Sequence, residues 1–146
     1  MGKLTKIIFG LIFILTFSAC SDFESQIVNE INSDTEKYTD LIESVENCHF
    51  STFLYGKFIN AEKFPDSLEL ALNKTRLKGK VNYIVIDKKN DCKGISVEFI
   101  LGNTHLEFDS CPDSEFPKPE TREKKGNIDI IGINNNWIIW IDNDFI

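Results

Sequence analysis

The chain has 146 residues, of which 42% are hydrophobic and 27% are charged, so its composition is that of one globular domain and not of a disordered, collagen-like or solenoid protein. Its net charge is −7 and its basic residues form no cluster. These two features exclude nucleic-acid binding, because that activity needs many lysines and arginines to neutralise phosphates.

The first 19 residues have the pattern of an export signal. Residues 1–6 include two lysines and no acid, and residues 7–19 are almost wholly apolar or small. A membrane-spanning helix needs about 20 apolar residues, so we expect this shorter stretch to be cleaved. Its removal takes away Lys3 and Lys6, which leaves 14 basic and 23 acidic residues and a net charge of −9.

The residues Thr16-Phe17-Ser18-Ala19-Cys20 resemble the lipobox of bacterial lipoproteins, with Phe17 where that family most often has leucine. The resemblance implies that Cys20 becomes the new N-terminus and carries three acyl chains such as palmitate, enough for stable attachment to a membrane. Ser21 follows, where an aspartate tends to retain such proteins in the inner membrane. The resemblance therefore favours the outer membrane, at its periplasmic face or at the cell surface.

The alternative is an ordinary secretory signal, with Cys20 just inside the mature protein. On the lipoprotein interpretation, residues 1–19 are the signal peptide and residues 20–24 are a lipidated anchor and short tether. Residues 25–146 are then a single domain.

Residues 25–47 are predicted to form one amphipathic helix. Apolar or semi-polar residues recur there at spacings of three and four, namely Val28, Ile31, Thr35, Tyr38, Ile42 and Val45. Packing on the domain's own sheet is favoured over a coiled coil, because the stripe lasts only about two and a half heptads. Residues 49–64 are rich in aromatics and are predicted to be core-forming.

A short second helix is predicted to begin at Pro65-Asp66, with Asp66 as its N-cap. Its buried side consists of Leu68, Ala71 and Leu72. From there on the period of the sequence changes to two.

Five strands are predicted, at residues 81–87, 95–101, 105–109, 128–133 and 137–142. The last two are joined by Asn134-Asn135-Asn136, a hairpin signal. Residues 110–127, which contain three prolines and many charges, are predicted to be the longest loop. Helices followed by consecutive strands indicate an α+β fold, with two helices packed on an antiparallel sheet of about five strands.

Three cysteines remain besides Cys20, so at most one internal disulfide can form in the oxidising envelope. If the three middle strands make a meander, Cys92 in a turn and Cys111 after the third strand lie at the same edge of the sheet. This favours a Cys92–Cys111 disulfide, and the alternative is a pair between Cys48 and one of the two. If Cys48 forms no disulfide, we expect it to be a buried packing residue, and the alternative is a reactive thiol.

His105, Glu107 and Asp109 alternate along one predicted strand and so share a face. They are the residues around which a metal site or catalytic cleft would be assembled, although alternating polar residues are also typical of a solvated face. The chain has no phosphate-binding glycine loop, catalytic serine motif or paired-cysteine zinc motif. We therefore predict no metal site, cofactor or catalytic residue, with a motif-less enzyme as the less favoured alternative.

The last predicted hairpin is apolar on both faces. Trp137 and Ile139 point to one face, and Ile138 and Trp140 point to the other. Since a sheet with helices on one side should have a polar second face, two interpretations stay open. Either the hairpin is buried on both sides within the domain, or a partner covers one face, with Trp137, Ile138 and Trp140 as the candidate binding residues.

The expected form is thus a small, acidic, lipid-anchored domain with a compact body. Immunity proteins and inhibitors of cell-wall enzymes often share this general form. The sequence favours a protein-binding or inhibitory module that acts on another envelope or secreted protein. The rival is a structural component of envelope assembly.

Overall fold

The computed structural model describes residues 23–48, 56–89, 92, 94–113 and 116–144. Its described helical and extended elements are, in chain order, α2 (Phe23–Ser33), α3 (Thr35–Asn47), β1 (Ile59–Asn60), the 3-10 helix η2 (Ala61–Lys63), α4 (Asp66–Leu72), β2 (Tyr83–Lys88), β3 (Ile95–Leu101), β4 (Thr104–Asp109), β5 (Arg122–Lys125), β6 (Ile128–Gly132) and β7 (Trp137–Asp142).

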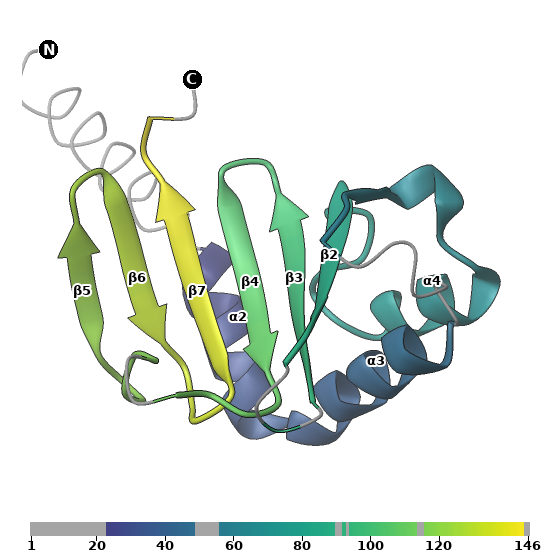
Figure 1. Cartoon of the computed structure of the whole chain (residues 1–146), viewed down its shortest axis with the longest axis horizontal. Coiled ribbons are helices and arrows are strands. Elements are labelled where there is room, and N and C mark those ends of the chain that lie inside the picture. The colour runs from purple at the N-terminus through teal and green to yellow at the C-terminus, as the bar shows by residue number, and fades with distance from the viewer. Residues whose placement is uncertain (1–22, 49–55, 90–91, 93, 114–115, 145–146) are drawn as a thin grey trace, which may run out of the picture.

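The strands form one antiparallel sheet in the order β1-β2-β3-β4-β7-β6-β5. In the view of Figure 1, α2 lies behind the sheet, and α3 and α4 extend to the right past β2. The predicted α+β class is confirmed. The sheet has seven strands where the sequence predicted about five.

The single helix predicted over residues 25–47 is wrong, because α2 and α3 meet at Asp34, whose backbone is not helical (φ −144°, ψ 65°). The residues on either side of Asp34 have hydroxyls that compete for the helix carbonyls. Ser33 Oγ donates to the carbonyl of Glu30 and Thr35 Oγ1 donates to that of Ile31. The break turns α3 relative to α2 while both keep an apolar side toward the sheet.

The core lies between the helices and one face of the sheet. The largest fully buried side chains come from both layers and include Tyr38, Phe99, Ile27, Ile31, Leu41, Leu68, Ile84, Leu106 and Ile139. The predicted buried side of α4 is confirmed. Pro65, with extended backbone, occupies the N-cap position in place of Asp66, which is the first helical residue.

Two strands were missed by the sequence analysis. β5 lies inside the predicted loop, and all four of its side chains are charged and exposed. It carries no apolar signal because it is an edge strand, where charges discourage pairing with other chains. β1 lies in the segment predicted to be core-forming: Ile59 is buried, but Phe58 is 70% exposed. Residues 49–55 of that segment lie outside the described residues.

The Cys92–Cys111 disulfide predicted from the meander is confirmed. β2, β3 and β4 pair consecutively, which brings the turn after β2 and the end of β4 to one edge of the sheet. Cys48 is a free, half-buried cysteine near Ser67 Oγ. Burial raises the pKa of the Cys48 thiol, which keeps it protonated and suits a packing role better than a nucleophilic one.

Candidate functional site

The candidate site lies on the side of the sheet that the helices leave uncovered, which we call the helix-free face. Strand register assigns side chains to the two faces. On β7, Trp137 and Ile139 point toward the helices and are almost fully buried, whereas Trp140 points to the helix-free face and is partly exposed. The helix-free face is turned toward the reader in Figure 1.

One row of side chains on the helix-free face is mostly apolar and aromatic. It runs directly across five paired strands, from β2 through β3, β4 and β7 to β6, and we call it the aromatic row. Its members are Tyr83, Ile100, His105, Trp140 and Ile130. Residues directly opposite each other on neighbouring strands touch, so this row is continuous across the sheet. Ile100 is buried within it (8% exposed), and the other members are at least partly exposed.

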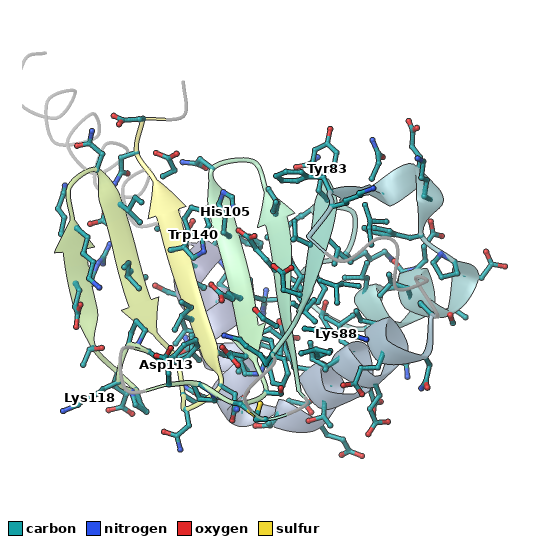
Figure 2. The ribbon with its side chains drawn as sticks, in the orientation of Figure 1. Tyr83, Lys88, His105, Asp113, Lys118 and Trp140 are labelled. Atoms are coloured by element: carbon teal, nitrogen blue, oxygen red, sulfur yellow. A yellow bond between two sulfur atoms is a disulfide. The ribbon has the colours of Figure 1, made fainter. Side chains whose placement is uncertain are left out.

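His105 is held at the centre of the aromatic row. Its ring stacks on the Trp140 ring with 3.6 Å between centroids and an angle of 15° between planes. Its Nδ1 lies 2.6 Å from Glu98 Oε1. Figure 2 shows His105 and Trp140 side by side on adjacent strands. These two contacts fix the orientation of both rings before any partner arrives.

Carboxylates border the aromatic row. Glu98 and Glu107 are directly opposite on β3 and β4, and Ser96 Oγ donates to Glu107 Oε1 (3.3 Å). Partial burial and the neighbouring charge of Glu98 raise the pKa of the Glu107 carboxyl. The helix-free face is therefore acidic around an aromatic centre.

The other end of the helix-free face, next to the disulfide, is closed by residues 116–121. Gly132 exchanges backbone hydrogen bonds with Glu120 and Thr121, both of 2.9 Å. The Lys118 carbonyl lies so close that a Cβ on Gly132 would collide with it. Ile138 is opposite Gly132 and is only 7% exposed. The open part of the face is thus the end near the β3–β4 turn, around Trp140, with Asp113 and Lys118 at the other end (Figure 2).

The structure separates the three predicted partner-binding residues. Trp137 packs in the core, with its ring centroid 5.5 Å from that of Tyr38 and 5.0 Å from that of Phe108. Ile138 is on the helix-free face but is buried. Of the three, Trp140 alone combines the helix-free face with a partly exposed side chain.

Sequence reasoning missed Tyr83, Ile100 and Ile130 as members of the same row. Each was assigned to a predicted strand, and their alternation was visible. The β2–β3–β4 meander alone aligns Tyr83 and Ile100 with His105. Joining them to Trp140 and Ile130 depends on β4 pairing with β7, a non-sequential pairing for which the chain carries no local signal.

His105, Glu107 and Asp109 do share a face as predicted, but they do not form one site. Asp109 is buried at the disulfide end, where it pairs with Lys89 Nζ (2.5 Å) and accepts a hydrogen bond from the Cys111 amide (2.8 Å). Among the described residues, no three His, Cys, Asp or Glu side chains are grouped so as to hold a metal ion.

Comparisons with protein-family models, curated proteins and solved structures gave no significant match. In the part of the chain that the structure describes, every helix is too short or too polar to cross a membrane. The functional interpretation therefore depends on the site itself.

Proposed function

We propose that this protein is a lipid-anchored lipoprotein of the bacterial envelope that binds another envelope or secreted protein through the helix-free face of its sheet. Inhibition of that protein, as an immunity protein inhibits a toxin, is the form of binding that the small acidic domain suits best. The proposed anchor is the lipid on Cys20.

The aromatic row is the observation that carries this proposal. When helices cover one face of a sheet, the side chains on its other face are normally polar. Here aromatic and aliphatic side chains continue across that face over five strands. Tyr83 is 39% exposed and Phe58, whose ring lies 6.0 Å from that of Tyr83, is 70% exposed. Aromatic residues of this kind are enriched at the centres of protein interfaces.

The position of the site relative to the anchor supports a role at the membrane surface. Helix α2 begins three residues after Cys20, a stretch that spans at most about 11 Å. Thr104 Oγ1 donates to Glu24 Oε1 (3.1 Å), so the start of α2 lies beside the start of β4, next to His105. A lipid on Cys20 would keep the open end of the helix-free face close to the bilayer.

Affinity capture tests the proposal. The full chain would be expressed in its native organism and recovered with an antibody, comparing the wild type with Trp140→Ala and with Leu70→Ala. Leu70 is a matched control because it is an exposed apolar residue on α4 (65% exposed), on the helix side. We expect a stoichiometric partner with the wild type and Leu70→Ala that is lost with Trp140→Ala.

Two results would contradict the proposal. One is equal recovery of the partner with Trp140→Ala, after circular dichroism has shown that this variant is folded. The other is recovery of no partner by the wild type. Labelling with radioactive palmitate, lost in Cys20→Ser, tests the anchor separately.

A further inference from the structure

A cavity of about 560 Å³ opens on the helix-free face beside Trp140. Its walls include the rings of Phe58, Tyr83, His105 and Trp140, contributed by β2, β4, β7 and the residue before β1. Ile100 forms part of the lining between Tyr83 and His105. A cavity of this size, mostly apolar with a few polar groups, is the usual form of a ligand-binding pocket.

Apart from His105, which is held against Glu98, the polar part of the lining is acidic or neutral. Asp142, Asn60 and Asn82 line the cavity, and within the described part of the chain no lysine or arginine does. The surrounding strands add outward-facing carboxylates that are at least partly exposed, namely Asp87, Glu98, Glu107 and Glu123, against one lysine, Lys125 on the edge strand β5. Asp109 also points outward but is buried with Lys89. The charge around the cavity therefore attracts a cation.

Aromatic rings beside a carboxylate suit one cationic group best. A guanidinium is planar, is weakly hydrated and stacks on aromatic faces, where its attraction to the ring adds to hydrogen bonds with a carboxylate. The Asp142 carboxylate accepts a hydrogen bond from the Asp144 amide (2.9 Å) but has no cation beside it among the described residues of the lining. An anionic group would therefore be repelled, and a purely apolar group would bury this charge without a counter-charge.

We propose that this cavity binds an arginine side chain of the partner protein, with the guanidinium between Tyr83 and the stacked His105–Trp140 pair and its charge balanced by Asp142. The inference rests on the proposed function and specifies the partner, which presents a basic surface to this acidic face. Complementary charge of this kind also accelerates association and excludes acidic competitors.

The test uses the processed, full chain in detergent micelles with ¹⁵N only in the tryptophan indoles. The chain has two tryptophans, of which Trp140 lines the cavity and Trp137 is buried on the other side of the sheet. The probe is N-acetyl-arginine amide, and the matched control is N-acetyl-citrulline amide, which has a similar shape and no charge. We expect the arginine compound to shift the Trp140 signal saturably, the Trp137 signal to stay in place, and the citrulline compound to bind about tenfold more weakly.

Substitutions then test whether Asp142 supplies the negative charge that the arginine compound needs. Asp142→Asn should weaken binding of the arginine compound about tenfold, since it removes one charge-assisted contact. Glu43→Gln removes the same charge from an exposed position on α3 and should leave the affinity unchanged. An unmoved Trp137 signal shows that each variant is folded.

Several results would overturn the inference: no shift of the Trp140 signal, equal shifts with citrulline, unchanged affinity in Asp142→Asn, or saturable binding of N-acetylglucosamine in place of the arginine compound. The affinity capture tests the proposed function independently of this ligand. If the captured partner depends on Trp140 but the arginine compound does not bind, the binding face stands and the cationic partner is wrong.

Discussion

The two tryptophans of β7 show how the two faces of the sheet differ. Trp137 and Trp140 are three residues apart, so they point to opposite sides. Trp137 is 3% exposed and packs among Tyr38, Phe99 and Phe108. Trp140 is partly exposed, stacks on a histidine and lines a cavity. The same residue type thus stabilises the fold on one face and provides a recognition surface on the other.

The largest expected effect is on the helix-covered face. Trp137→Ala should lower the free energy of unfolding by about 3–5 kcal/mol, because it leaves a large cavity among three aromatic rings. Urea denaturation followed by circular dichroism measures it. A loss below about 1 kcal/mol would contradict the assignment of Trp137 to the core.

Next is the disulfide, which closes a loop between positions separated by 19 residues. Replacing both Cys92 and Cys111 by serine should cost about 3 kcal/mol of stability, as expected for a loop of this size. The same denaturation experiment on oxidised and reduced wild-type protein gives an independent value. Equal midpoints for the oxidised and reduced forms would show that the bridge does not stabilise the domain.

On the helix-free face, Trp140→Ala should cost only about 1–2 kcal/mol, from the stacking on His105 and partial burial. Its main effect is expected on partner recovery. The comparison between the faces fails if Trp140→Ala destabilises the domain as much as Trp137→Ala does.

The smallest effect concerns pH. Because the folded state raises the pKa of Glu107 above its ordinary value of 4.5, the folded protein keeps this proton at pH values where the unfolded chain has lost it. The contribution of Glu107 to stability is therefore most favourable at low pH and declines as pH rises from about 4.5 through the raised pKa.

Glu107→Gln should accordingly raise the melting temperature at pH 7 by a few degrees, on the order of 0.5 kcal/mol. The difference from the wild type should shrink as the pH approaches 4.5. Thermal melts at pH 7, 6 and 5 measure this. A lower melting temperature of the variant at pH 7 would contradict the raised pKa.

The sequence predicted the parts of the fold that depend on local pattern. Period-two alternation located β3, and the Asn134–Asn136 hairpin signal located β7. The meander of the middle strands favoured the Cys92–Cys111 pair over a pair with Cys48, and the structure confirms it. The break at Asp34 was missed because apolar spacing continues through it, and β5 was missed because its charged residues pair through the backbone alone.

The site was only partly predictable for a different reason. The two-sided apolar pattern of β7 identified an unusual strand, but not which tryptophan faces the helices. That depends on the register with β4 and on the turn of α3 at Asp34, which brings Tyr38 against Trp137. The cavity also depends on Phe58, the residue before β1, and on Tyr83 of β2, which lie near the β1 edge of the sheet, away from β7 in the strand order.

Site-specific photocrosslinking shows directly whether the helix-free face contacts a partner protein. A benzophenone amino acid would replace Tyr83 on the helix-free face or Leu70 on the helix side in the full chain, in cells of the native organism. Both positions are exposed and apolar or aromatic. We expect a discrete protein adduct from position 83 that disappears when Trp140→Ala is added, and none from position 70. An adduct from position 70 alone, or from neither position, would contradict this expectation.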